Sequence, residues 1–108
     1  MSEVLIKKLE KMVSQFDEIE KQLGDTAVLM DPSRVRDLSV KRAAISDVVE
    51  QYRTFQKLND RITENEEIIE QNSDPELMEI AREELPDLHK QREQWLQQIA
   101  NRLATAAD

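Results

Sequence analysis

The feature that most constrains the fold is a break in a long helical pattern at residues 72–75. Asp74 suits a helix N-cap because its carboxylate can accept backbone N–H bonds, and Pro75 fits the first helical turn, where its missing donor would be unpaired anyway. Residues 33–70 contain no glycine or proline, so one long helix is the simplest interpretation of that stretch. We therefore expect two long antiparallel helices joined at this break.

Apolar residues recur at helical spacing before and after it. The first seam steps by four and three, the spacing of helices that pack in bundles and coiled coils, and consists of Leu5, Leu9, Met12, Phe16, Ile19 and Leu23. The pattern predicts helices over residues 3–23, 32–71 and 75–104. Gly24 is expected to end the first helix in a left-handed conformation. Residues 24–31 should form a loop whose side chains at 28–30 pack against the bundle.

Two positions are expected to disturb the longer helices. Pro86 removes one backbone hydrogen bond and predicts a kink near residues 82–86 rather than a stop. The apolar pattern thins at residues 65–67, where a bend or fraying is expected. Leu77, Met78, Ala81 and Leu85 are expected to share one face of the third helix.

The predicted fold is all-α, a three-helix antiparallel bundle or coiled coil forming a single domain over residues 1–108. Its second and third helices are expected to form a projecting hairpin, in which paired residues have numbers adding to about 147. In the first two helices, paired numbers should add to about 56. All three helices are expected to overlap around Leu5, Leu9, Met12, Ile45, Val48, Tyr52, Trp95, Ile99 and Leu103.

Charge is concentrated at the hairpin. The chain has a net charge of −8, yet residues 60–87 alone hold eleven acids and two arginines, a net charge of −9. We call residues 56–90 the acidic hairpin. Because this surface repels phosphate backbones, no direct nucleic-acid binding is expected through it. The alternative interpretation is a solvated helix tip that charge keeps soluble.

Composition also bounds the setting of the protein. No apolar run of about 18 residues occurs, so no membrane span is expected. The first residues carry charge too early for a signal peptide, and the absence of cysteine is compatible with a reducing compartment. The expected location is the cytoplasm.

No catalytic, cofactor or metal residues are predicted. The chain has one histidine, His89, and neither cysteine nor a glycine-rich loop. Pro86 stands three residues before His89, where a di-iron bundle would need a glutamate. A metal-binding carboxylate bundle would also need acids facing inward, and the apolar seams contain none.

The order of these motifs resembles the N-terminal helical domain of the bacterial peptide chain release factor 1 family, over roughly residues 3–103. The resemblance rests on Leu5–Glu10 and Leu23–Asp25, Leu38–Ser39 with Ile45–Val49 and Tyr52, and above all residues 74–85, Asp-Pro-Glu-Leu-Met-Glu-Ile-Ala-Arg-Glu-Glu-Leu. The family directs termination at UAA and UAG stop codons. Its peptide-releasing Gly-Gly-Gln and its codon-reading Pro-x-Thr motif are absent here, and the family's continuation into a further domain does not follow Leu103.

The resemblance therefore implies a non-catalytic module for positioning and partner contact, whose partners would be the stalk-base region of the ribosome and the GTPase release factor 3. The acids expected to make this contact are Glu66, Glu67, Glu70, Glu76, Glu79, Glu83 and Glu84. The alternative is a stand-alone acidic coiled-coil adaptor unrelated to translation. Self-association of the hairpin through exposed Leu77, Ile80 or Ile68 also stays open.

Overall fold

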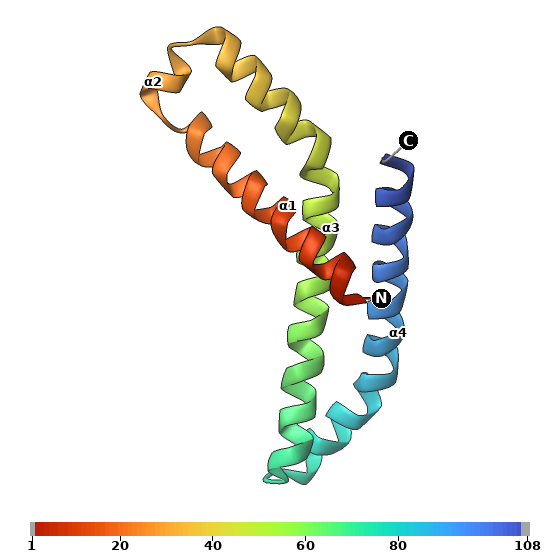
Figure 1. The fold of residues 1–108 in the computed structure, drawn as a ribbon. Helices are drawn as coiled ribbons and strands as arrows, with labels where there is room; N and C mark the ends of the chain where they lie inside the picture. Colours follow the sequence, from red (N-terminus) through yellow and green to blue (C-terminus); the bar gives the residue numbers. More distant parts are fainter. Residues whose placement is uncertain (1, 107–108) are drawn as a thin grey trace. The chain divides into compact units, whose positions relative to one another are not determined.

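The computed structural model describes the backbone of residues 2–106 and the side chains of residues 3–104. Over these residues it contains four helices and no strand: α1 (Ser2–Leu23), α2 (Thr26–Leu29), α3 (Pro32–Gln71) and α4 (Pro75–Ala106) (Figure 1). The all-α class is thereby confirmed. The chain divides into two compact units, residues 1–50 and 51–108, with the division inside α3. The expected single domain over residues 1–108 stays a prediction.

Aspartate caps fix where the two longest helices begin. The Asp31 carboxylate accepts hydrogen bonds from the backbone N–H groups of Ser33 at 3.2 Å and Arg34 at 3.3 Å. Asp74 accepts in the same way from Glu76 at 3.0 Å and Leu77 at 3.4 Å. These bonds satisfy donors that have no partner inside the helix, so α3 and α4 begin at the prolines that the sequence indicates.

Residues 24–31 differ from the expected loop. Asp25 accepts a hydrogen bond from the backbone N–H of Ala27 at 2.9 Å and caps the short helix α2. No glycine has a positive φ, so the predicted left-handed stop at Gly24 is wrong. A second N-cap follows Gly24 at once, and the chain turns without a left-handed residue. Of the three residues expected to pack inward, Val28 is buried, whereas Leu29 and Met30 are exposed.

Unit 1 pairs α1 with the first part of α3 in antiparallel fashion (Figure 1). Leu9, Phe16 and Ile19 of the predicted seam are buried. The Arg42 guanidinium lies 4.8 Å from the centre of the Phe16 ring and 3.7 Å from the Glu20 carboxylate. The numbers of Arg42 and Phe16 add to 58, close to the expected 56, whereas those of Arg42 and Glu20 add to 62.

Unit 2 is a helical hairpin made by the rest of α3 and by α4, which pack against each other. Its turn contains Asn72, whose φ of 52° is a left-handed conformation that asparagine tolerates better than most residues. The core of the hairpin includes Leu58, Ile62 and Leu88, with Leu85 and Trp95 packed against them. Truncating a buried leucine such as Leu88 to alanine would cost about 2–5 kcal/mol.

Polar contacts across unit 2 confirm the predicted register. Arg92 lies over the Phe55 ring, 5.3 Å from its centre, and these two numbers add to the expected 147. The Arg92 side chain also donates a hydrogen bond to Asn59. This contact, and those of Glu84 with Asn65 and Arg61, depart from the expected sum by no more than four. The three-helix overlap that was expected joins residues of both units and stays a prediction.

The two expected disturbances have different outcomes. The fraying expected at residues 65–67 is wrong, because α3 continues to Gln71 and Asn65 is only 9% exposed, whereas the alternative of a bend stays a prediction. Pro86 lies inside a continuous α4, as predicted. Figure 1 shows the axis of α4 curving in its first half, in the cyan to light-blue stretch.

Candidate functional site

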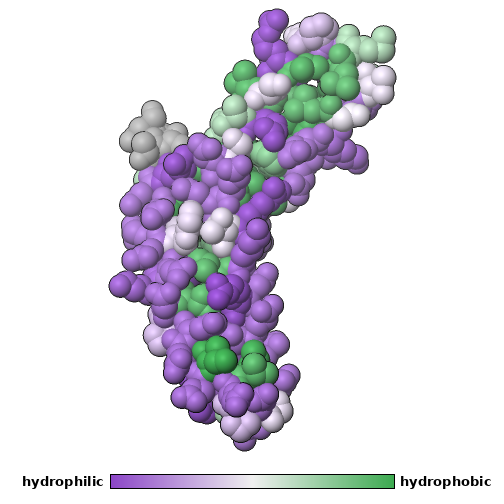
Figure 2. Space-filling view, turned by 180° about the vertical axis from the view of Figure 1, so that it is seen from behind, coloured by the Kyte–Doolittle hydropathy of each residue, from purple (hydrophilic) through white to green (hydrophobic). Residues whose placement is uncertain are grey.

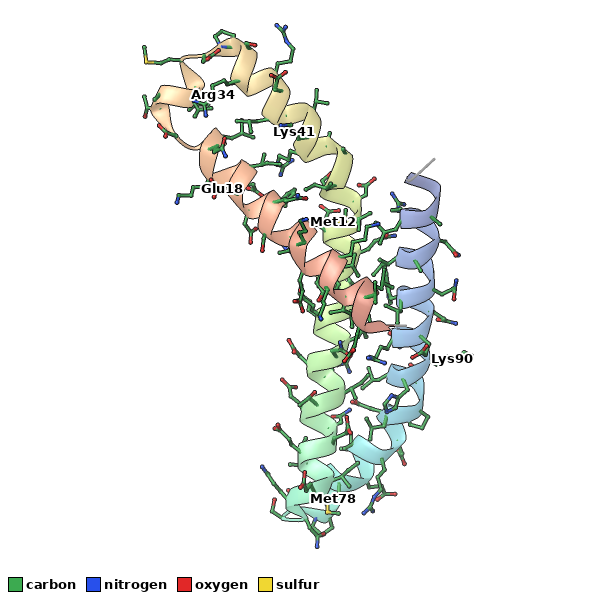
Figure 3. The ribbon with its side chains drawn as sticks, in the orientation of Figure 1. Met12, Glu18, Arg34, Lys41, Met78 and Lys90 are labelled. Atoms are coloured by element: carbon green, nitrogen blue, oxygen red, sulfur yellow. The ribbon has the colours of Figure 1, made fainter. Side chains whose placement is uncertain are left out.

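The seven predicted contact acids gather at the closed end of unit 2. Three of them come from the end of α3 and four from the beginning of α4, on either side of the turn at residues 72–74. All seven residues are exposed. Met78, which is buried at the same end of the hairpin, marks its place in Figure 3. The reversal of the chain therefore brings together carboxylates from two helices.

Only one of these acids is held by a neighbouring side chain within the described part of the chain. The Glu84 carboxylate accepts a hydrogen bond from the Asn65 amide at 3.1 Å and lies 3.6 Å from the Arg61 guanidinium. The carboxylates of the other six have no ion pair or hydrogen bond with described side chains. Six exposed negative charges are thus available to a partner.

Four of these acids stand at a spacing that lowers the stability of the helices that carry them. Glu66 and Glu70 stand four residues apart on α3, and Glu79 and Glu83 stand four apart on α4. Like charges at this spacing face each other on the helix surface and cost a few tenths of a kcal/mol, about 0.2–0.5 per pair. These acids therefore weaken their own helices, which favours a role outside the fold.

Apolar side chains are exposed among these charges. Leu77 and Ile80 are 49% and 52% exposed, whereas Met78 and Ala81 are buried. Leu77 and Ile80 are thus exposed as expected, although Leu77 has helical spacing with the two buried residues. Two helices can cover only one stripe of α4, and Leu77 lies at the edge of that stripe. In Figure 2 the hairpin end at the bottom of the view is largely hydrophilic with apolar surface set within it.

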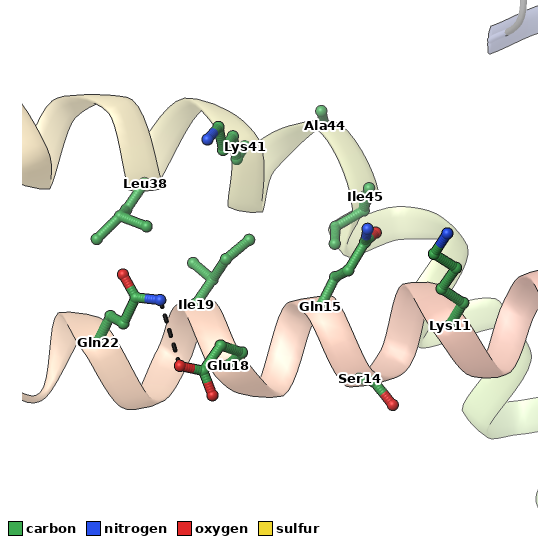
Figure 4. Close-up of a pocket in the computed structure, with 10 residues that line it drawn as sticks. All are labelled: Lys11, Ser14, Gln15, Glu18, Ile19, Gln22, Leu38, Lys41, Ala44 and Ile45. Carbon is green, nitrogen blue, oxygen red and sulfur yellow. Dashed lines mark hydrogen bonds between the residues drawn. The ribbon is translucent and has the colours of Figure 1, made fainter.

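Unit 1 holds a second surface feature that the sequence did not reveal. An open groove of about 720 Å³ runs between α1 and α3. We call it the α1–α3 groove. Figure 4 shows Ile19 of α1 and Leu38 and Ile45 of α3 directed toward the space between the helices. The remaining lining residues are Lys11, Ser14, Gln15, Glu18, Gln22, Lys41 and Ala44. Because its two walls belong to different helices, whose lining residues lie at least 16 positions apart in the sequence, neither stripe alone signals a groove.

A metal site and a membrane-spanning helix each have requirements that the described residues do not meet. No group of three or more histidine and acidic side chains among them is arranged to hold a metal ion. None of the described helices combines the length and apolar character needed to cross a lipid bilayer. His89, the one histidine, is exposed on α4.

Comparison with known proteins places the sequence in a family. The PCRF domain matches residues 12–108, which is most of the chain. The chain belongs to the PCRF domain family. The acidic hairpin lies entirely within the residues that the PCRF domain matches, and so does most of the α1–α3 groove, of which only Lys11 falls outside.

Individual relatives of this PCRF-family chain carry a consistent name. Peptide chain release factor 1 of Listeria monocytogenes serotype 4a is 35% identical over 85 residues, which are 79% of this chain and 24% of the relative. The protein of the same name from Anaeromyxobacter is 37% identical over 91 residues, 84% of this chain and 24% of the relative. The chain thus spans about a quarter of the length of these relatives. No solved structure shows a significant match. The resemblance to release factor 1 is confirmed.

Proposed function

We propose that this chain acts in translation termination as a non-catalytic module that positions a release factor and contacts its partners. Its membership of the PCRF domain family and its similarity to proteins named peptide chain release factor 1 support this role. By the same similarity, the whole protein would direct termination at UAA and UAG codons on ribosomes in the cytoplasm. The sequence printed here has one glycine, so a Gly-Gly-Gln motif for peptide release would have to lie elsewhere.

The acidic hairpin is the surface we assign to partner contact. The observation that carries this proposal is the group of six exposed carboxylates without a described partner, four of which stand in like-charge pairs four residues apart. A surface of this kind attracts a basic protein surface and speeds its association. Exposed Leu77 and Ile80 would add apolar contact area at the centre of the charged region.

The resemblance to the release factor 1 family implies two partners. The first is the stalk-base region of the ribosome, and the second is the GTPase release factor 3. The acidic hairpin would engage a basic protein surface on either one, because the phosphates of ribosomal RNA would repel it.

A charge-reversal variant tests the proposal. We expect Glu66→Lys, Glu67→Lys and Glu83→Lys together to weaken binding to ribosomes or to the GTPase by about tenfold or more at moderate salt, since three attractive charges become repulsive. Glu84 is left unchanged, because it is already engaged by Asn65 and Arg61. Binding would be measured by titration, and helicity by circular dichroism.

The matched control reverses three exposed acids of unit 1, Glu3, Glu10 and Asp37. Its net charge equals that of the hairpin variant, so a general charge effect would weaken both proteins equally. Affinity that is the same for the wild-type chain and the hairpin variant would contradict a contact through the acidic hairpin.

A further inference from the structure

The α1–α3 groove has an apolar floor and a basic rim. Ile19 is buried, and Leu38 and Ile45 are half-buried on the floor. Lys11 and Lys41 are exposed at the rim, one from each helix. In Figure 2, turned to the opposite face, the end of unit 1 that carries α2 also shows much apolar surface. Two helices and a short third leave an apolar side of unit 1 open.

The charges on the rim are not balanced. Neither Lys11 nor Lys41 has an ion pair with a described residue. The one acid of the rim, Glu18, accepts a hydrogen bond from the Gln22 amide at 3.3 Å. The groove therefore fits a helix that presents apolar side chains flanked by acids.

The acidic hairpin carries such a helix. Leu77 and Ile80 stand three residues apart on the exposed side of α4, so they lie on neighbouring turns of one face. Glu76 and Glu83 precede and follow Ile80 by four and three residues, and both are exposed without a described ion pair. An apolar pair flanked by two acids is the complement of an apolar floor flanked by two lysines.

We propose that the α1–α3 groove of one copy of this chain binds the acidic end of α4 of a second copy. The contact joins two different surfaces, so each copy offers both a groove and a helix to its neighbours. A groove of this size buries little area, and a dissociation constant on the order of 0.1–1 mM is expected.

Sedimentation equilibrium over a range of protein concentrations tests this contact. The wild-type chain should show a weight-average mass that rises with concentration and falls back as salt is added. Lys11→Glu with Lys41→Glu, and separately Glu76→Lys with Glu83→Lys, should each raise the dissociation constant by about tenfold or more. A control with Lys57→Glu and Lys90→Glu matches the charge change of the lysine variant at exposed sites outside both the groove and the acidic end of α4, and should associate like the wild type; Figure 3 labels Lys90 on α4.

Mixing the two variants gives the sharpest outcome. In each variant alone, groove and helix carry the same sign of charge and repel, but in the mixture each groove meets a helix of opposite sign. Association restored by mixing supports the proposal. A wild-type chain that stays monomeric at about 1 mM would overturn it. So would association that needs only the α4 residues, since that result indicates pairing between two hairpin ends.

The same variants separate this inference from the proposed function. The groove variant keeps the acidic hairpin intact, so its binding to ribosomes or to the GTPase should equal that of the wild type. Either proposal can therefore fail while the other stands. Circular dichroism of all variants shows whether each retains its helices, which is expected because the substituted residues are exposed.

Discussion

Asn65 is a buried polar residue whose hydrogen-bond partner lies on the other helix of the hairpin. It is the one polar side chain among the buried residues described, at 9% exposure, and its amide donates a hydrogen bond to Glu84 across the hairpin. A polar residue in an apolar stripe signals a weak point when one helix is considered alone. The partner that satisfies it stands nineteen residues away, so the sequence pattern gave no sign of the bond.

Asn65→Asp should destabilise unit 2 by about 1–3 kcal/mol, because it replaces a donor facing Glu84 with a second carboxylate. Asn65→Leu should cost less, since Glu84 is exposed and can be solvated by water. Urea unfolding monitored by circular dichroism measures both. Adding Glu84→Gln to Asn65→Asp restores a donor and should recover most of the loss. Equal stability of wild type and Asn65→Asp would show that the bond contributes nothing.

At the scale of elements, helix starts were the most predictable feature. Asp31 and Asp74 each precede a proline and accept backbone hydrogen bonds, which is a local signal that needs no tertiary contact. The helix at Thr26–Leu29 has the same kind of cap in Asp25, but four residues are too few to show a helical period.

Exposure was less predictable, for a physical reason. Leu29 and Met30 were expected to pack inward beside Val28, yet both are exposed, because whether a side chain at the end of a bundle is covered depends on how many helices pack there. The α1–α3 groove could not be predicted from the sequence for a similar reason, because residues of two helices line it together. The contact acids were named from the sequence, but only the structure of the hairpin shows that six of the seven have no partner among the described side chains.

Helix α4 contains Pro86 in its interior, where a proline lowers helix stability. Pro86 is exposed, so replacing it removes little packing. Pro86→Ala should raise the free energy of unfolding by up to about 3 kcal/mol, because alanine restores a donor to the Arg82 carbonyl and removes a clash. Urea unfolding measures the change. Gln94→Ala, at another exposed site of α4, is the control and should stay within about 0.5 kcal/mol of the wild type. A loss of stability in Pro86→Ala would mean that packing in unit 2 requires the curved helix.

For the whole molecule, net negative charge is confined to one region of the sequence. Residues 60–87 carry a net charge of −9, more than the −8 of the whole chain, and they lie within the residues that the PCRF domain matches. The chain spans about a quarter of relatives named peptide chain release factor 1. We infer that this quarter supplies contact rather than chemistry.

The proposed contact through the acidic hairpin is tested most directly by the rate of peptide release in a reconstituted termination reaction on ribosomes that hold a UAA codon. A full-length release factor 1 and the GTPase release factor 3 would be present, and the chain would be added in excess. We expect the wild-type chain to lower the rate of peptide release, because it competes with the full-length factor for the partner surface that both would bind. The variant with Glu66→Lys, Glu67→Lys and Glu83→Lys should have little effect. Equal rates with and without the wild-type chain, at concentrations well above that of the full-length factor, would contradict the proposed contact.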